Sequence, residues 1–304
     1  MIYITKVDDD SYEAEERFTN EIIVHNDMML KKYYKIRHME GLSPYTLDSY
    51  INYLRVLSRE VGKRYEDMNA TNIRDFMIDY KERRNLSDYS LDSIRLMFNA
   101  FFTFLENEDY IKRSPMRKIK HIKFESTVRI PFTDEEMVRL RDACANIKEL
   151  AIIDFLYETG CRVSEVVSLD IDDIDFENRE LIVCGKGKKE RIVYFGPNAK
   201  IHLEKYLETR TDGKSPLFVQ SKFPNDRMNR SGIEFLVKQI GQRAGIKDCY
   251  PHKFRRTLAT RLLEKGMPIE QVKEVLGHSS IDTTLVYAKV NNTEVKNNHR
   301  KHVS

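Results

Sequence analysis

The stretch from residue 251 to residue 287 constrains this chain more than any other part of its sequence. Its pattern predicts one helix over 252–265 and a second over 268–276. A glycine and a proline between the two end the first helix and start the second. Gly277 then closes the second helix. A third helical run is expected at 281–289, so the stretch folds as three short helices joined by tight turns.

The same stretch concentrates chemically useful side chains. His252 and Arg255 are three positions apart, which puts both on one face of a helix. His278 directly follows a glycine, and Tyr287 stands nine residues further on (287 − 278). Two imidazoles, a guanidinium and a phenol, without paired carboxylates or a metal-ligand cluster, suit an enzyme in which a tyrosine attacks a phosphate held by positive charge.

Composition restricts the possible folds and functions of the chain less closely. With 304 residues, of which 41% are hydrophobic, it can bury one large core or two smaller ones. A third of the residues are charged, yet the formal net charge is only +3. A nucleic-acid-binding function therefore requires basic residues that are clustered, not merely abundant.

The cysteines and the hydropathy pattern favour a soluble cytoplasmic protein. The four cysteines are scattered without a C-x-x-C pair, which argues against a disulfide framework or a zinc site. No apolar run reaches the length of a membrane span, and the acidic N-terminus lacks a signal-peptide pattern. We expect no metal, no cofactor and no membrane contact.

The N-terminal third predicts a helical domain. Residues 1–18 are expected to be an acidic, poorly ordered tail, and the domain itself covers 19–111. Ser43 and Ser87 are the expected N-caps of two amphipathic helices, in segments that echo each other in sequence. With helices at 19–38 and 71–81, they make a four-helix unit. The phenylalanine run in the last of these helices is expected to be core.

A basic segment, 112–130, follows as an interdomain linker. It holds seven lysines and arginines against Glu125 alone among acids. Such runs are usually solvated linkers. Because this one joins a helical module to a phosphate-handling domain, we expect Lys118, Lys120 and Lys123 to contact the DNA backbone, where each neutralised phosphate releases counterions.

The remainder, 131–304, is predicted to be one mostly helical domain that ends in a polar tail. Thr133 and Glu136 form a capping box at its start. Residues 180–195 read as a β-hairpin with G-K-G-K-K at its turn. That turn lacks the spacing of a phosphate-binding P-loop. Further helices are expected at 134–145, 148–159, 163–169, 198–209 and 231–243. The fold class is mainly α with one small antiparallel sheet.

Four motifs together resemble the tyrosine recombinase (phage integrase) family, in its two-domain, Xer-like form. They are G-C-R-V-S-E at 160–165, G-K-G-K-K-E-R at 185–191, H-x-x-R at 252–255, and L-G-H-x-x-x-x-T-T-x-x-Y at 276–287. The resemblance spans about 42–290. It implies that 19–111 is a SAM-like core-binding domain and that 131–304 is the catalytic domain.

The resemblance assigns six catalytic residues: Arg162, Lys186, His252, Arg255, His278 and Tyr287. Alone, each has a plainer explanation, such as a surface arginine, a solvated hairpin tip or a half-buried tyrosine. By resemblance the arginines bind the scissile phosphate, the histidines hydrogen-bond it and the tyrosine, and Lys186 is the general acid. Arg256 stands where many relatives carry a second histidine, and we expect it to contact DNA.

The implied reaction is site-specific recombination of double-stranded DNA. Tyr287 would form a 3′-phosphotyrosine, and because the bond energy is kept, neither metal nor ATP is needed. Four copies would exchange strands through a Holliday junction in the bacterial cytoplasm, bound to the nucleoid, with accessory or directionality proteins as further partners. Two alternatives remain: a topoisomerase-like enzyme that only nicks and relaxes DNA, and a DNA-binding protein with a decayed site. The presence of all six side chains argues against decay.

Overall fold

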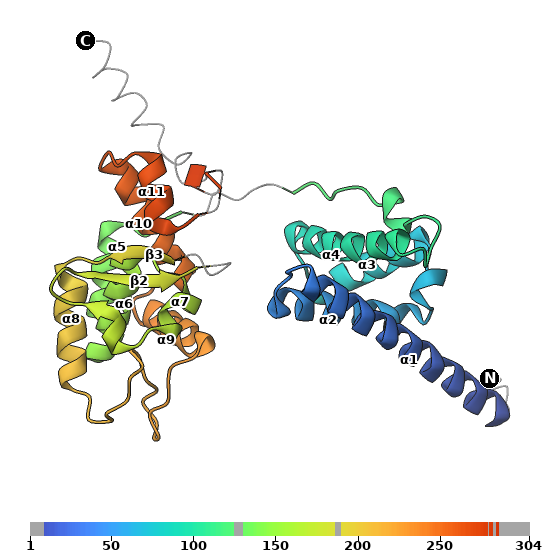
Figure 1. The fold of residues 1–304 in the computed structure, drawn as a ribbon, viewed down its shortest axis with the longest axis horizontal. Helices are drawn as coiled ribbons and strands as arrows, with labels where there is room; N and C mark the ends of the chain where they lie inside the picture. Colours follow the sequence, from blue (N-terminus) through green and yellow to red (C-terminus); the bar gives the residue numbers. More distant parts are fainter. Residues whose placement is uncertain (1–8, 125–129, 186–189, 279, 282–283, 286–304) are drawn as a thin grey trace, which may run out of the picture. The chain divides into compact units, whose positions relative to one another are not determined.

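The computed structural model describes residues 9–124, 130–185, 190–278, 280–281 and 284–285, with side chains from residue 20 onward. The chain divides into two compact units, Met1–Thr127 and Val128–Ser304 (Figure 1). Among the described residues, the first unit is helical and the second combines helices with one antiparallel sheet. The predicted fold class, mainly α with a small sheet, is confirmed.

In the described part of the first unit, four α-helices are present. They are α1 (Asp9–Met39), α2 (Pro44–Val61), α3 (Ala70–Arg84) and α4 (Asp88–Asn107). Helix α1 begins at Asp9, whereas the sequence pattern placed its start near Thr19. The expected acidic tail, 1–18, is therefore helical from Asp9 onward.

The two echoing serines are N-caps, as predicted. The Ser43 hydroxyl accepts a hydrogen bond from the Thr46 amide, and Ser87 accepts one from the Ser90 amide, both at 3.2 Å. The helices that they start pack around an aromatic core. Phe98, Phe101 and Phe102 of α4 are fully buried there, which confirms that this run is core.

The basic segment is partly anchored to the first unit. A short 3₁₀ turn, Pro115–Lys118, follows α4. Farther along, the amide of Ile122 donates to the buried carboxylate of Asp92 at 3.0 Å, and Arg95 donates to the same carboxylate. This contact fixes the backbone of the basic segment. Lys118, Lys120 and Lys123 extend from that segment into solvent.

The helices of the second unit match the predicted ones within a few residues. They are α5 (Asp134–Asp142), α6 (Ile147–Thr159), α7 (Val163–Ser168), α8 (Pro197–Glu208), α9 (Arg230–Arg243), α10 (Pro251–Glu264) and α11 (Ile269–Leu276). Thr133 and Glu136 form the predicted capping box. The helix expected at 281–289 falls largely outside the described residues.

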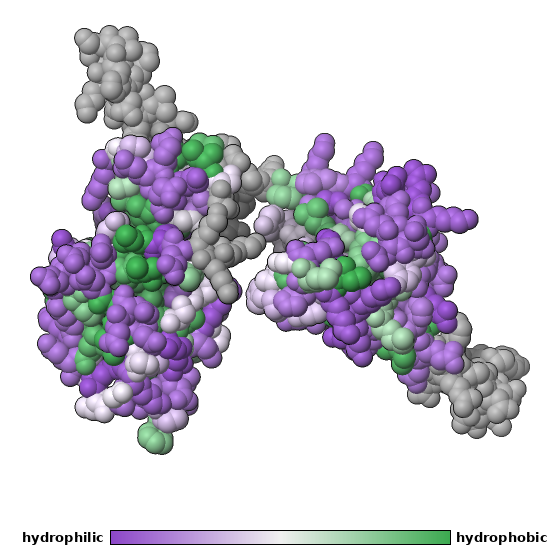
Figure 2. Space-filling view, in the orientation of Figure 1, coloured by the Kyte–Doolittle hydropathy of each residue, from purple (hydrophilic) through white to green (hydrophobic). Residues whose placement is uncertain are grey.

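The sheet has the order β1-β2-β3 and is antiparallel throughout. Its strands are β1 (Ile174–Asp175), β2 (Glu180–Cys184) and β3 (Glu190–Tyr194). Val183 of β2 lies opposite Arg191 of β3. On the outer face, Ile182, Ile192 and Tyr194 are exposed, and Figure 2 shows apolar side chains in this region of a mostly hydrophilic surface. The inner face packs on the core.

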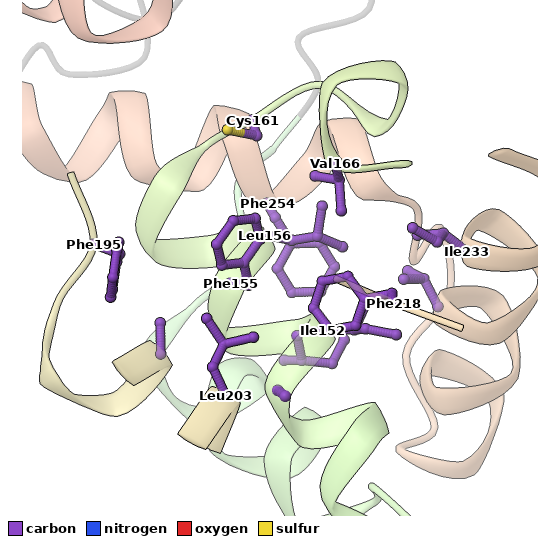
Figure 3. Packing of buried hydrophobic residues seen from close by; sticks show 14 of the residues in the cluster. Ile152, Phe155, Leu156, Cys161, Val166, Phe195, Leu203, Phe218, Ile233 and Phe254 are labelled. Carbon is purple, nitrogen blue, oxygen red and sulfur yellow. The ribbon is translucent and has the colours of Figure 1, made fainter. Parts of the chain in front are cut away.

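Helix α6 lies at the centre of this core and packs against α8 and α10. Phe155 and Leu156 are buried around it with Phe254 of α10, as Figure 3 shows. Because α6 is rigidly packed, its C-terminal end at Gly160 is a fixed point. The candidate functional side chains gather around that point.

Candidate active site

The end of α6 requires glycine. Gly160 adopts a φ of +59°, the left-handed conformation that caps helices and that side chains disfavour. A Cβ atom there would lie 2.8 Å from Cδ2 of Leu258 and 3.2 Å from Cδ2 of Leu276. Glycine therefore allows α10 and α11 to approach the end of α6, where the chain turns into the segment that carries Arg162.

The buried side chain of Arg255 links α6, α10 and α11. It stands on α10 and is 1% exposed. Its Nη1 donates to the Gly160 carbonyl at 2.7 Å, and its Nη2 donates to the carbonyl of Leu276. The guanidinium is thus a buried cation that satisfies carbonyls at the ends of α6 and α11, which side chains or water must otherwise satisfy.

Arg162 is the more accessible of the two arginines, with a side chain that is 36% exposed. Its Nη2 donates to the Gly277 carbonyl at 3.0 Å. Its Nη1 donates to Oε1 of Glu165, and its backbone amide donates to Oε2 of the same carboxylate, both at 2.8 Å. The N-terminus of α7 therefore fixes both the backbone and the head group of Arg162.

Two residues of this network were missed by the sequence analysis, although both stand within quoted motifs. Arg191 of β3 grips Glu165 bidentately, with Nη1 to Oε1 at 2.8 Å and Nη2 to Oε2 at 2.9 Å. The Glu165 side chain is 3% exposed and that of Arg191 12%. Burial acts to raise the pKa of Glu165, but hydrogen bonds from Arg191 and Arg162 outweigh it and lower the pKa to about 2.

The C-terminal end of α11 is where these arginines meet. Arg191 donates from Nε to the Val275 carbonyl at 3.2 Å, so three successive carbonyls, 275, 276 and 277, each accept from a different guanidinium. A helix leaves its last carbonyls without helical partners and carries partial negative charge at that end. The helix end therefore holds three cations together.

His278 follows this helix end directly and is 8% exposed. Burial, with the positive charges of Arg255 and Arg162, lowers the pKa of the imidazole to about 4; His252 and Arg191 add to the effect. The ring is therefore neutral at neutral pH. Its Nδ1 lies 2.8 Å from Oγ1 of Thr284. A neutral imidazole can hydrogen-bond a phosphate or a phenol without adding charge.

A cleft of about 570 Å³ opens beside this cluster. Arg162 and His252 line it, and α9 contributes Arg230, Glu234 and Lys238 to its wall. His252 is exposed, in contrast to Arg255 on the same helix. The cleft therefore presents more positive than negative charge to a ligand, as a phosphate-binding surface requires.

Four of the six predicted catalytic residues thus lie around the end of α11: Arg162, His252, Arg255 and His278. Lys186 and Tyr287 lie outside the described residues. Of the predicted DNA contacts, Lys118, Lys120 and Lys123 are exposed. Arg256 is only 7% exposed, and its Nη1 lies 3.4 Å from the Tyr250 hydroxyl.

Within the described ranges, no three histidine, cysteine or acidic side chains gather as a metal site would require. No helix within the same described ranges has the length and apolarity needed to cross a bilayer.

Protonation of Glu165 is expected to destabilise the second unit in acid. Because its pKa in the folded chain is about 2 against an ordinary 4.5, the contribution is full above pH 4.5 and is lost as the pH falls towards 2. It amounts to about 3 kcal/mol, at 1.36 kcal/mol per unit. Urea unfolding at a series of pH values should show this loss in wild type and a flatter profile in Glu165→Gln. Equal slopes for the two proteins would contradict the assignment.

Comparison with known proteins agrees with this geometry. The model of the phage integrase family matches residues 131–294, and that of the phage integrase N-terminal SAM-like domain matches 29–112. Tyrosine recombinase XerA of Pyrococcus horikoshii is 31% identical over 272 residues, which cover 89% of this chain and 91% of the relative. Tyrosine recombinase XerC of Oceanobacillus iheyensis is 32% identical, over 86% and 91%.

The fold is also that of a solved recombinase structure. The Tn1549 transposon integrase in complex with a circular intermediate DNA superposes with a TM-score of 0.72 at 18% identity, over 91% of this chain and 98% of that one. The family models and the curated relatives place the chain in a class of DNA strand-transfer enzymes. The chain belongs to the phage integrase family and is a site-specific recombinase of the tyrosine type.

Proposed function

We propose that Tyr287 is the nucleophile and that the residues around the end of α11 stabilise the phosphate that it attacks. The phenol oxygen bonds to phosphorus while the bond from phosphorus to the 5′ oxygen breaks, which leaves a 3′-phosphotyrosine and a free 5′ hydroxyl. Attack by another 5′ hydroxyl reverses the step and joins new strands. Because one phosphoester replaces another, the step needs no external energy source.

The gathering of three arginines at the end of α11 is the observation that carries this proposal. In-line displacement builds negative charge on the phosphate oxygens, and fixed donors stabilise that charge because they need no reorganisation. Arg162 and His252 line the cleft and would meet the phosphate first. Arg255 and the neutral ring of His278 are more deeply buried, and hydrogen bonds and packing keep both in place.

Two further roles rest on the family motifs. Lys186, in the turn between β2 and β3, would donate a proton to the departing 5′ oxygen. Tyr287 must lose its phenolic proton as it attacks, and its ordinary pKa near 10 means that nearby positive charge has to assist. The arginine cluster would supply that charge. Both roles are proposals for this chain.

The DNA would be held by both units. We propose that 19–111 binds the core site, that 131–304 is catalytic, and that the segment 112–130 follows the DNA backbone between them. A homotetramer would exchange strands in pairs through a Holliday junction, in a bacterial cytoplasm and together with directionality proteins. The complex of the Tn1549 integrase with a circular intermediate DNA supports DNA as the partner.

Covalent capture tests the proposed function. The protein is recovered from its own cells under denaturing conditions, and any DNA that stays attached is sequenced, with cells that lack the protein as background. Attached DNA with one common end is the expected result, because cleavage at a specific site leaves the same 3′ end each time. An absence of attached DNA above background would contradict the proposal. Relaxation of a supercoiled plasmid by the purified protein without any recombination product would favour the topoisomerase-like alternative.

Each linker lysine should contribute to affinity without contributing to sequence preference. Lys118→Ala, Lys120→Ala and Lys123→Ala are each expected to weaken binding to a duplex of arbitrary sequence. Each should also reduce the slope of log K against log salt by about 1, because one phosphate contact releases about one counterion. Fluorescence anisotropy over a salt series measures both. Lys205→Ala, an exposed lysine on α8, is the matched control; slopes that fall equally in all variants would contradict the assignment.

A further inference from the structure

We propose that Arg191 is a positioning residue for cleavage, which acts by sharing the carboxylate of Glu165 with Arg162 and by fixing the end of α11. The inference rests on the proposed function, because it concerns the same phosphate site. The side chain of Arg191 is 12% exposed and lines no part of the cleft, whereas that of Arg162 is 36% exposed and lines it. Arg191 would therefore act through its neighbours and not by touching the phosphate.

Arg191 affects the charge around Arg162. Oε1 of Glu165 accepts from the guanidiniums of both Arg191 and Arg162, and Oε2 accepts from the guanidinium of Arg191 and the backbone amide of Arg162. Two cations share one anion, so the group of three keeps one net positive charge. Without Arg191, Arg162 and Glu165 would form a neutral pair, and the guanidinium that lines the cleft would attract phosphate less strongly.

Arg191 also fixes the geometry at the end of α11. The Nε of Arg191 donates to the Val275 carbonyl, one residue before the carbonyl that holds Arg255 and two before the one that holds Arg162. Gly277 adopts a φ of +63°, and a Cβ there would lie 2.7 Å from Cδ of Arg191. Arg191 therefore packs directly against Gly277, which precedes His278, and it fixes the position of the backbone there.

Arg191 also connects separate elements of the second unit. It belongs to β3. Its hydrogen bonds join this strand to α7 through Glu165 and to α11 through Val275. One side chain thus links β3 to the two helices next to which Arg162 and His278 stand. A shift of about 1 Å at such a junction can cost about 100-fold in rate.

Single-turnover cleavage tests this role. The probe is a nicked duplex that carries the site recovered with wild-type protein, at saturating enzyme, with DNA affinity and thermal unfolding measured alongside. Arg191→Lys keeps the charge but cannot grip the carboxylate bidentately while also reaching Val275. It is expected to cleave about 100-fold more slowly with unchanged DNA affinity. Cleavage at the wild-type rate would overturn the proposal.

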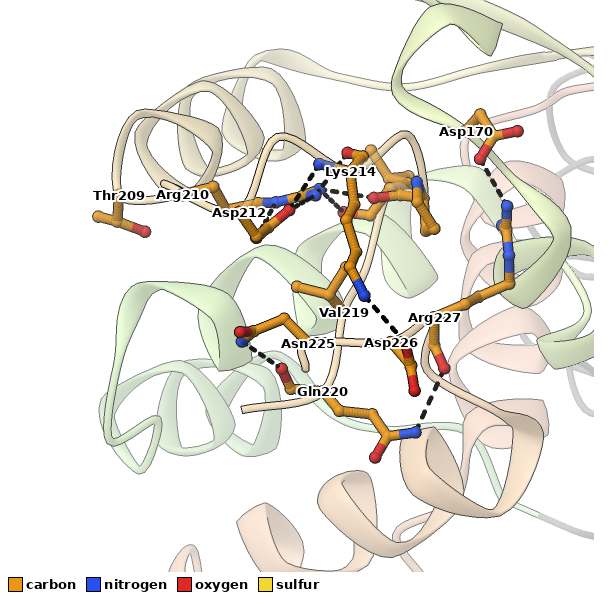
Figure 4. A network of polar contacts seen from close by, with 12 residues as sticks. Asp170, Thr209, Arg210, Asp212, Lys214, Val219, Gln220, Asn225, Asp226 and Arg227 are labelled. Atoms are coloured by element: carbon orange, nitrogen blue, oxygen red, sulfur yellow. Dashed lines mark hydrogen bonds and ion pairs between the residues drawn. The ribbon is translucent and has the colours of Figure 1, made fainter. Parts of the chain in front are cut away.

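A matched control separates positioning from general packing. Arg210, on the loop after α8, also grips a carboxylate bidentately, that of Asp212, and donates to the carbonyls of Lys214 and Pro216 (Figure 4). None of these partners is one of the residues around the end of α11. Arg210→Lys should therefore cost stability but leave the cleavage rate unchanged. Equal loss of rate in both lysine variants would show a packing effect and overturn the role of Arg191.

A double variant tests the role of Arg191 in a protein that is expected to fold. Arg191→Met alone leaves Glu165 as a buried charge with one partner fewer, which can unfold the domain. The pair Arg191→Met with Glu165→Gln removes both charges and should fold. If Arg191 acts through Glu165, this double variant cleaves no more slowly than the slower of the two single variants, Arg191→Met and Glu165→Gln. Strictly multiplicative losses would overturn that route. Wild type without any cleavage would instead contradict the proposed function, and the role of Arg191 with it.

Discussion

Replacing Tyr287 by phenylalanine is expected to abolish covalent attachment of DNA while DNA binding stays intact. The substitution removes one oxygen and keeps the aromatic ring, so it deletes the nucleophile with little change in shape. Arginines and histidines of the site can still bind the phosphate, but nothing is left to form the phosphotyrosine. The measurement compares covalent complex on denaturing gels with affinity from anisotropy.

The control for that experiment is another tyrosine of the same unit. Tyr194 on β3 is 54% exposed and lies on the outer face of the sheet. Tyr194→Phe should attach DNA as wild type does. Attachment that persists in Tyr287→Phe would mean that one of the other 15 tyrosines (16 − 1), or another residue type, is the nucleophile.

Replacing Arg255 by alanine is expected to have the second largest effect, on rate and on stability together. Loss of one preorganised cation typically slows a reaction of this kind by about 10²–10³-fold. The same change leaves the carbonyls of Gly160 and Leu276 buried without their donor, at about 1–3 kcal/mol for each group. It also opens a cavity between three packed helices.

Arg255→Lys separates the two contributions. An ammonium keeps the positive charge but, as a point donor, cannot span both carbonyls as the planar guanidinium does. We expect this variant to unfold at a lower temperature than wild type and to cleave faster than the alanine variant. Rates must be measured well below each unfolding midpoint. A folded Arg255→Ala that cleaves at the wild-type rate would contradict the role of Arg255.

Local structure in this chain follows from local sequence. The caps at Ser43, Ser87 and Thr133 are visible because a capping side chain bonds amides two or three residues away. The helices match for the same reason, since their apolar spacing lies within one segment. The two residues of β1 went unpredicted because a strand that short has no period to detect.

The chemistry of the site was predictable in kind but not in arrangement. The resemblance to the family predicted Arg162, His252, Arg255 and His278 as site residues, and in the structure these four lie around one helix end. Nothing in the sequence indicates that Arg191 pairs with Glu165, 26 residues away (191 − 165), because such a contact depends on tertiary packing. The burial of Arg256 was equally invisible, since helical spacing alone does not say which face a neighbouring element covers.

The depressed pKa of His278 has the same origin. A histidine in isolation titrates near 6.5, and only burial beside Arg255 and Arg162 lowers its pKa to about 4. A neutral ring at this point can hydrogen-bond the phosphate or the phenol of the proposed mechanism.

Identification of the residue that carries the nucleotide would test the central claim most directly. The protein is captured with its DNA from cells, treated with nuclease and protease, and examined by mass spectrometry. The account predicts a nucleotide joined through its 3′ phosphate to the peptide that contains Tyr287. A nucleotide on any other residue, or a 5′ linkage, would contradict it.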